Sequence, residues 1–211
     1  MFTLIIGNKN FSSWSLRPWL VLKMLDEPFE ERSIDLRAPD ASQKILAVNP
    51  AGKVPMLHDR HLKIWDSLAI CEYLAECFPH AQLWPAGSAE RAYARSVVAE
   101  MHSGFPHLRQ AMPMDIVGRH PTPPLEAALQ REIDRVLTIW NELRQESVAA
   151  GPFLFGHFTI ADAFFAPVAA RFVSYQYPLS GLAAEYADHL LALPAMRQWA
   201  EGAAQEAALA R

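Results

Sequence analysis

Along the first eighty residues, short apolar runs alternate with one-sided helical patterns. The run at residues 1–6 predicts a buried strand, and apolar residues between 16 and 24 recur at helical spacing. A Glu-Pro pair ends that helix, and residues 29–36 predict a second strand. The chain therefore begins with a β-α-β unit.

Shorter elements complete this first part of the chain. A short helix is predicted at residues 43–48 and ends in an Asn-Pro-Ala-Gly turn. Two short strands at 54–57 and 62–65 are expected to form a hairpin, and an amphipathic helix at 67–78 closes the unit. The layout β-α-β, α, β-β-α is that of a thioredoxin-like domain.

The rest of the chain lacks a strand pattern. Residues 79–87 hold two prolines and a glycine and predict a linker. A helix is predicted at 89–109, with a bend at Pro106 because proline lacks an N–H and collides with the preceding turn. A second long helix is expected to open at Thr122-Pro123-Pro124. Its predicted buried stripe consists of Leu125, Leu129, Ile133, Val136, Trp140 and Leu143.

A mostly apolar helix at 161–172 is expected at the centre of a bundle. Thr159 and Asp162 precede and open it with the spacing of a capping box. Further helices are predicted at 181–191 and 194–207. The pattern after the linker is therefore all-helical.

Two domains follow from these patterns. We expect an α/β fold of thioredoxin-like type at residues 1–80 and an all-α bundle at residues 88–211. The hydrophobic content of 51% is ample for packed cores in both.

Charge and composition exclude several classes of protein. The net charge is −4, and Lys and Arg form no run, which argues against a nucleic-acid partner. No apolar stretch approaches membrane-spanning length, and the opening apolar run is too short for a signal peptide. A cytoplasmic location without membrane contact is therefore expected.

The cysteines and histidines do not form a metal-binding pattern. Cys71 and Cys77 are six residues apart in one predicted helix, so they point in different directions and are expected to be small buried residues. His58 and His61 lie in the predicted hairpin turn, and no further ligands cluster with them. No metal site is predicted.

Two segments place polar groups at helix starts. Ser12 and Ser13 come just before one helix, and Asp66-Ser67 opens another. The first turn of a helix leaves N–H groups unpaired and carries the positive end of the helix dipole, so it binds anions. Together the segments suit a small peptide with a carboxylate at one end and a thiol in the middle, such as glutathione.

The whole chain resembles the cytosolic glutathione transferase family. The resemblance rests on four motifs in the family's order: Ser12 to Arg17, Val54-Pro55, Asp66-Ser67 and Thr159 to Asp162. A Ser five residues before an Arg at the start of the first helix is similar to the serine-type classes, especially zeta and tau. Glutathione would then be the co-substrate.

The resemblance also implies roles for individual residues. Ser12 would donate a hydrogen bond to the glutathione sulfur and keep it ionised. Val54-Pro55, with a cis bond, would pair with the cysteinyl backbone. Ser67 would bind the γ-glutamyl carboxylate, Asp66 would face its amino group, and Lys53 would reach the glycyl carboxylate.

The second-substrate pocket is expected to be apolar and to accept an electrophile. Its candidate residues are Phe11, Trp14, Phe105 and Arg109. His102 and His107 are five apart and are interpreted as surface or packing residues. The identity of the acceptor does not follow from generic apolar side chains.

Three functions stay open at this point. The first is a glutathione transferase. The second is a zeta-like, glutathione-dependent cis-trans isomerase, although Trp14 stands where the zeta class has Cys. The third is a non-catalytic binding module, which the joint presence of Ser12, Val54-Pro55 and Asp66-Ser67 argues against. The family resemblance further implies a homodimer.

Overall fold

The computed structural model describes residues 1–209. A four-stranded sheet is formed by β1 (Phe2–Gly7), β2 (Phe29–Ile34), β3 (Met56–Asp59) and β4 (Leu62–Trp65), in the order β2-β1-β3-β4. β1 is parallel to β2 and antiparallel to β3, and β3 is antiparallel to β4. The strands predicted from the sequence are therefore present in one mixed sheet.

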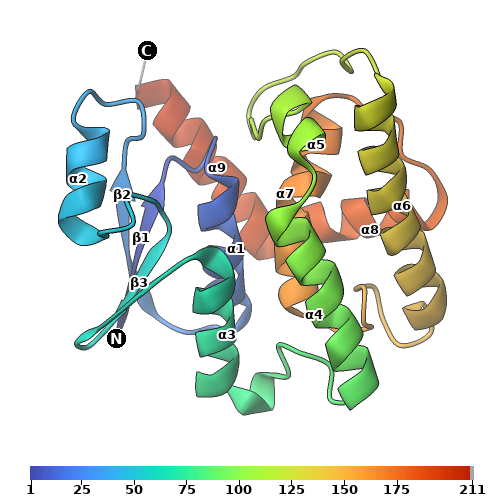
Figure 1. Ribbon diagram of the computed structural model, residues 1–211, viewed down its shortest axis with the longest axis horizontal. Coiled ribbons are helices and arrows are strands. Elements are labelled where there is room, and N and C mark those ends of the chain that lie inside the picture. The colour runs from blue at the N-terminus through green and yellow to red at the C-terminus, as the bar shows by residue number, and fades with distance from the viewer. Residues whose placement is uncertain (210–211) are drawn as a thin grey trace.

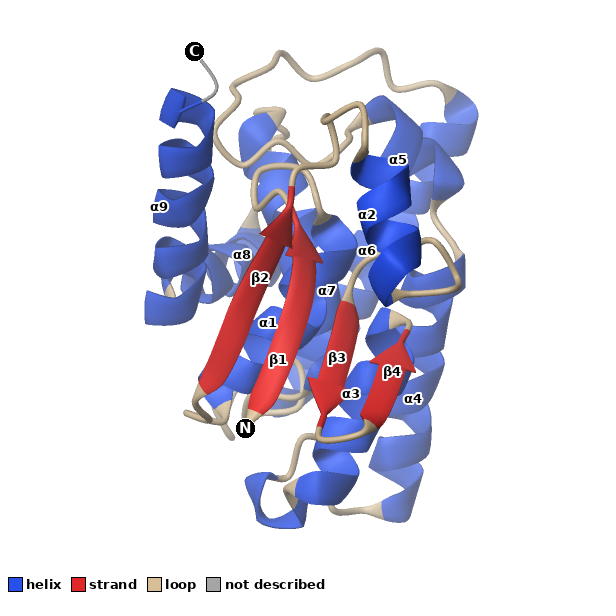
Figure 2. Ribbon diagram, turned by 90° about the vertical axis from the view of Figure 1, so that its left-hand side faces the viewer, coloured by secondary structure: helices blue, strands red, loops and turns tan. Residues whose placement is uncertain are grey.

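Helices cover both faces of this sheet. α1 (Ser13–Met24) and α3 (Ser67–Cys77) lie between the sheet and the later helices, and α2 (Ala41–Val48) lies on the opposite face (Figures 1 and 2). This arrangement confirms the predicted thioredoxin-like fold.

The second part of the chain is helical. Its elements are η1 (Pro79–Ala81), α4 (Ser88–Ser103), α5 (Pro106–Ala111), α6 (Ala127–Ser147), α7 (Ile160–Ser174), α8 (Gly181–Ala192) and α9 (Pro194–Leu209). α7 is buried along almost its whole length, as predicted for the centre of a bundle. Among residues 1–209, none of the helices has the length and apolar character needed to cross a membrane.

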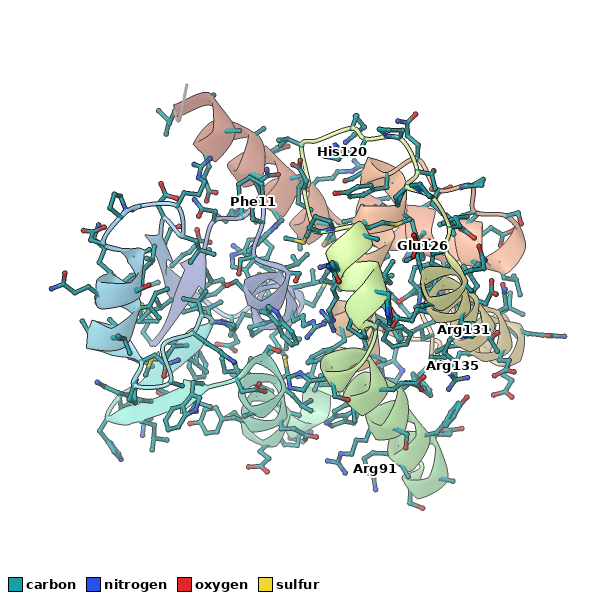
Figure 3. All side chains as sticks on the ribbon, turned by 45° about the horizontal axis from the view of Figure 1, so that its top comes forward. Phe11, Arg91, His120, Glu126, Arg131 and Arg135 are labelled. Carbon is teal, nitrogen blue, oxygen red and sulfur yellow. The ribbon has the colours of Figure 1, made fainter. Side chains whose placement is uncertain are left out.

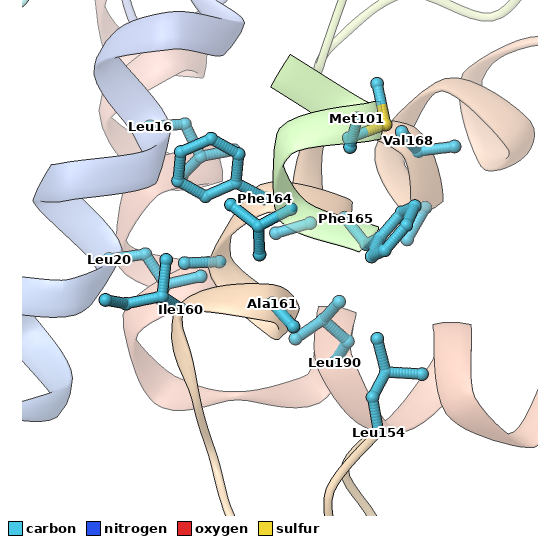
Figure 4. Close-up of a cluster of buried hydrophobic side chains, with 14 of the residues drawn as sticks. Leu16, Leu20, Met101, Leu154, Ile160, Ala161, Phe164, Phe165, Val168 and Leu190 are labelled. Carbon is cyan, nitrogen blue, oxygen red and sulfur yellow. The ribbon is translucent and has the colours of Figure 1, made fainter. Parts of the chain in front are cut away.

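A continuous core joins the two parts of the molecule. Leu16 and Leu20 of α1 belong to the same buried cluster as Ile160 and Phe164 of α7, and Figure 4 shows them facing each other. All four side chains are 0% exposed. The sheet unit and the bundle are therefore held together by packed apolar side chains.

The predicted bend at Pro106 is a complete break. α4 ends at Ser103 and α5 begins at Pro106, with Phe105 between them in a left-handed conformation (φ 61°). Proline disfavours helical geometry at the residue before it, which explains why the helix ends instead of bending. At Gly104, a Cβ would lie 2.7 Å from the carbonyl oxygen of Glu100, so this close turn requires glycine.

Two further expectations are corrected. α6 begins at Ala127, not at Thr122, because Pro123 and Pro124 keep the preceding backbone extended. Leu125 consequently lies outside the helix and is 41% exposed, whereas the other five residues of the predicted stripe are buried. Cys77 is exposed, in contrast to the buried Cys71.

Candidate functional site

A cavity of about 660 Å³ borders both parts of the molecule. It is lined by all five residues predicted to bind glutathione: Lys53, Val54, Pro55, Asp66 and Ser67. Trp14 of α1 and His102 of α4 complete its wall toward the bundle. The structure thus brings the predicted glutathione-binding residues together at one place, whereas Ser12 is not among the residues that line the cavity.

The start of α3 presents an anion-binding geometry to this cavity. Asp66 is the N-cap, with φ 74°, and its Oδ1 accepts from Leu68 N at 2.8 Å and Ala69 N at 3.3 Å. Ser67 is 1% exposed, and within residues 1–209 its buried Oγ has no hydrogen-bond partner. A hydroxyl donor at a helix N-terminus is suited to a carboxylate.

The turn opposite α3 is held by Asn49. Its Nδ2 donates to the Lys53 carbonyl at 2.7 Å, and its Oδ1 accepts from Ala51 N at 3.0 Å. The Val54–Pro55 bond that follows is cis, as the resemblance implied. Sequence reasoning missed the role of Asn49, although an Asn before a Pro-Ala-Gly turn is a recognisable turn signal.

Ser12 occupies the N-cap of α1. Its Oγ accepts from Ser15 N at 3.4 Å and donates to Ser15 Oγ at 2.7 Å. Ser15 Oγ in turn accepts from Gly7 N at 3.1 Å. Ser12 is 5% exposed, and Trp14, two residues further on, forms the adjoining wall of the cavity.

Ser13 links α1 to the bundle. Arg171 of α7 donates from Nη2 to Ser13 Oγ at 3.2 Å and from Nε to the Met112 carbonyl at 2.8 Å. A second link joins Asn10 Nδ2 to Asp115 Oδ1 at 2.9 Å. Ser13 is therefore engaged in holding the two parts together.

Trp14 is surrounded by cationic and ionisable groups. The guanidinium carbons of Arg17 and Arg109 lie 4.2 and 4.8 Å from the centre of its ring, and the His102 ring meets it edge-on at 5.2 Å. His102 Nε2 lies 3.2 Å from Asp66 Oδ2. Burial lowers the pKa of His102, a shift that Asp66 opposes. The sequence interpretation of His102 as a surface or packing residue missed its place in the cavity wall, because that place depends on how α4 packs on α1.

Three of the four predicted pocket residues do not line the cavity. Phe11 is 43% exposed beside Arg37, in a separate small depression next to α9 (Figure 3). Phe105 is buried and does not line the cavity. Arg109 is also absent from the cavity wall, although it contacts Trp14.

Arg17 is a fully buried cation. Its guanidinium lies over the rings of Trp14 and Phe164, at 4.2 and 4.4 Å. Within residues 1–209, none of its three side-chain nitrogens has a hydrogen-bond partner. Burial first, and then repulsion from Arg109 and Arg171, lower the pKa of Arg17.

Replacing Arg17 with Met is expected to raise the free energy of unfolding of the ligand-free protein by about 1–2 kcal/mol, because a buried charge without a partner opposes folding. Thermal and urea unfolding measure this change. The control is Arg135→Met, which removes an exposed ion pair with Glu100 and is expected to change stability by less than about 0.5 kcal/mol. A clear loss of stability in Arg17→Met would mean that the guanidinium is already satisfied without a ligand.

Residues 1–209 contain no cluster of His, Cys, Asp and Glu suited to hold a metal ion. His58 lies in β3 and His61 in the hairpin turn before β4.

The fold and the cavity define a protein of the thioredoxin-like class, extended by a helical bundle that contributes one wall of the site. The family model described as "Glutathione S-transferase, N-terminal domain" matches residues 11–77. The model described as "Glutathione S-transferase, C-terminal domain" matches residues 125–202. Together they cover more than half of the chain, which therefore belongs to the glutathione S-transferase family.

Individual relatives agree with this assignment. A probable maleylacetoacetate isomerase of Caenorhabditis elegans is 35% identical over 107 residues, which are 51% of this chain and 49% of that protein. A stringent starvation protein A homologue of Haemophilus ducreyi is 28% identical over 159 residues, 72% of this chain and 66% of that protein. The chain thus spans about half to two thirds of the length of these curated relatives.

A solved structure is similar over nearly the full chain. A glutathione transferase homologue from Burkholderia, crystallised with bound glutathione, is 26% identical. The match has a TM-score of 0.73 and covers 97% of this chain and 98% of that one.

Proposed function

We propose that the protein is a serine-type glutathione transferase, in which Ser12 stabilises the thiolate of bound glutathione. The observation that carries the proposal is the unpartnered, buried Ser67 hydroxyl at the start of α3, opposite the Val54-Pro55 turn in a cavity of about 660 Å³. Ser67 binds the γ-glutamyl carboxylate, and Asp66, whose Oδ2 lies 3.2 Å from His102 Nε2, faces the amino group. Lys53, exposed at the cavity, pairs with the glycyl carboxylate.

Ser12 reaches the sulfur through a change in hydroxyl orientation. Since Ser15 Oγ accepts from Gly7 N, its own proton can be donated to Ser12 Oγ. The Ser12 proton is then free to bind the thiolate. One such hydrogen bond and the α1 dipole supply on the order of 2–3 kcal/mol, enough to ionise a thiol whose reference pKa is about 8.5 at neutral pH.

The thiolate then attacks an electrophilic carbon of the second substrate. A carbon–sulfur bond forms, and the displaced electron pair leaves with a leaving group or is taken up by a conjugated carbonyl that gains a proton from water. No general base is needed when the thiolate is the resting form.

Two alternatives remain distinguishable. The similarity to a probable maleylacetoacetate isomerase favours a glutathione-dependent cis-trans isomerase, in which the thiolate adds to a double bond and is later expelled. That activity consumes no glutathione, whereas a transferase does. A non-catalytic binding module would bind glutathione without lowering the pKa of its thiol.

Glutathione titration by calorimetry tests the proposal. Wild type is expected to bind, and Ser67→Ala is expected to weaken binding roughly tenfold or more, since a charge-assisted hydrogen bond is lost. Ser88→Ala is the matched control, because Ser88 is likewise the first residue of a helix but is exposed. If wild type does not bind glutathione at millimolar concentration, the proposal is wrong.

The domain limits 1–80 and 88–211, the homodimer and the cytoplasmic location stay predictions. The breaks between α3 and α4 support the limits. Membership of the glutathione S-transferase family supports the other two.

A further inference from the structure

His102 is the residue through which the helical bundle reaches the cavity. It lies in the last turn of α4 and lines the cavity wall. In the part of the chain that the structure describes, the other residues that line the cavity lie between Trp14 and Ser67. The binding mode described above gives the imidazole of His102 no role of its own.

The His102 ring is held by aromatic neighbours on two other helices. The Trp14 ring of α1 meets it edge-on at 5.2 Å, and the Phe164 ring of α7 lies 6.0 Å away. The His102 side chain is 25% exposed, so part of it contacts the cavity. The orientation that this packing selects places Nε2 3.2 Å from Asp66 Oδ2.

This orientation decides where the imidazole carries its proton. Nε2 faces a carboxylate oxygen, whereas Nδ1 is buried and has no hydrogen-bond partner within residues 1–209. The neutral ring with its proton on Nε2 donates to Asp66. A second proton would place an unpaired N–H donor at the buried Nδ1, which is costly, so the neutral form is favoured.

The charges around His102 have a net effect in the same direction. Burial is the main cause that lowers the pKa of His102. Asp66 of α3 opposes this shift, and Arg17 of α1 and Arg109 of α5 add to it. The imidazole therefore becomes charged only below its ordinary pKa of about 6.5, and Asp66 faces a neutral donor at neutral pH.

The two oxygens of Asp66 have different neighbours. Oδ1 accepts from the N–H groups of Leu68 and Ala69 and thereby caps α3. Oδ2 lies beside His102 Nε2 at the cavity. A carboxylate oxygen accepts two hydrogen bonds, so Oδ2 can bind the amino group of a ligand while His102 donates to it.

We propose that His102 is a positioning residue for glutathione, which holds Asp66 Oδ2 toward the γ-glutamyl amino group and makes glutathione binding depend on pH. This role rests on the proposed function, since that function assigns the amino group to Asp66. Neutral His102 leaves the negative charge of Asp66 to the ammonium group. Protonated His102 neutralises Asp66 and repels the ammonium, so affinity falls on acidification.

The geometry favours Asp66, and not a ligand carboxylate, as the partner of His102. Ser67 offers the carboxylate a buried hydroxyl without a partner within residues 1–209, at the positive end of the α3 dipole. His102 Nε2 is directed at Asp66 instead. An imidazolium bound to the carboxylate would strengthen binding on acidification, which is the opposite sign.

Calorimetric titration of wild type with S-methylglutathione at several pH values tests this role. This ligand has no free thiol, and its amino group is protonated from about pH 5 to about pH 7. Affinity is expected to fall at least about threefold from pH 7 to pH 5, because His102 takes up a proton beside Asp66. Constant affinity, or binding that strengthens toward pH 5, overturns the inference.

A ligand without the amino group separates this role from a structural one. (4-Carboxybutanoyl)-S-methylcysteinylglycine keeps both carboxylates of S-methylglutathione and lacks its ammonium group. It is expected to bind wild type more weakly at pH 7 and to lose no affinity toward pH 5, since His102 has no ammonium to repel. A parallel loss for both ligands would mean that acidification loosens the whole cavity, and it contradicts the proposal.

Two variants of His102 separate its proton from its hydrogen bond. His102→Gln keeps a neutral donor that does not titrate, so it is expected to remove the pH dependence and to keep the affinity at pH 7 within about threefold. His102→Leu removes the donor and is expected to lower the preference for the ligand with the amino group at least about threefold. A pH dependence that persists in His102→Gln excludes His102 as its source.

His107→Gln is the matched control. His107 also pairs with a carboxylate, Glu132, but it is exposed on α5 and does not line the cavity. Its replacement is expected to change neither the pH dependence nor the preference between the two ligands. If no variant at position 102 folds, the pH dependence of the two ligands in wild type still decides the matter.

The same titrations separate this role from the proposed function. If S-methylglutathione does not bind wild type at millimolar concentration, the proposed function fails and the role of His102 fails with it. If it binds with one affinity at every pH and equally well to His102→Leu, the proposed function stands and the role of His102 is wrong.

Discussion

Replacing Ser12 with Ala is expected to lower kcat/KM for glutathione addition on the order of 100-fold and to leave glutathione affinity nearly unchanged. In the proposed binding mode, the Ser12 hydroxyl contacts only the sulfur, and glutathione is held mainly through its carboxylates and backbone. Without this donor, the pKa of the bound thiol returns toward its reference value, and activity at neutral pH falls with the thiolate fraction.

Two measurements check this expectation for Ser12→Ala. Steady-state rates against pH should shift toward alkaline pH in the variant, and the ultraviolet absorbance of the thiolate should disappear near neutral pH. Since Ser12 is also a helix cap, a loss of about 1 kcal/mol in stability is expected and is measured separately. Ser13→Ala is the control, because its hydroxyl is bound by Arg171. A Ser12→Ala protein that keeps its thiolate would show that another group ionises the sulfur.

Replacing Asp162 with Ala is expected to destabilise the protein by about 3–5 kcal/mol. The carboxylate is 0% exposed and accepts hydrogen bonds from Thr159 N at 2.8 Å, Leu154 N at 3.1 Å and Tyr186 Oη at 3.1 Å. Removing the carboxylate leaves these donors buried and unpaired at the start of α7, the buried helix at the centre of the bundle.

Thermal unfolding measures the effect of Asp162→Ala, and a drop in Tm of roughly 10 °C is expected for a chain of this length. Asp188→Ala, at an exposed position of α8, is the control. A Tm within about 2 °C of wild type would mean that the capping box is dispensable.

The same residue gives stability a pH dependence. Burial raises the pKa of Asp162 to about 6 from an ordinary value of 3.8, and four hydrogen bonds only partly oppose this shift. The folded state therefore binds the proton more tightly than the unfolded state. This contribution is fully present below about pH 4 and is lost as the pH rises through about 6. Asp162→Ala should remove that slope.

The sequence predicted the order of the elements because each has a clear period or a clear breaker. The prediction was wrong at two proline positions: Pro123 and Pro124 delay the start of α6, and Pro106 ends a helix that was expected to bend. The prediction considered only the proline itself. A proline also disfavours helical geometry at the residue before it, and this restriction ends or delays the helix.

The candidate site was predicted only in part, for a different reason. Asp66, Ser67 and the Val54-Pro55 turn could be predicted because each lies at a helix start or turn that is visible in the local sequence. His102 and Arg171, by contrast, reach Trp14 and Ser13 across 88 and 158 residues of chain, as the contacts between them show. Only tertiary packing reveals such neighbours.

The continuous core between α1 and α7 also constrains how the protein can change. Removing α7 would expose the apolar side chains of Leu16 and Leu20 that face it, so the sheet unit is not a freely exchangeable module. Side chains of the cavity wall beside this joint, such as Trp14 and His102, are positions where a substitution can alter the site while the packing between α1 and α7 is kept. The cavity wall can therefore vary in sequence, whereas the packing that joins the sheet unit to the bundle cannot.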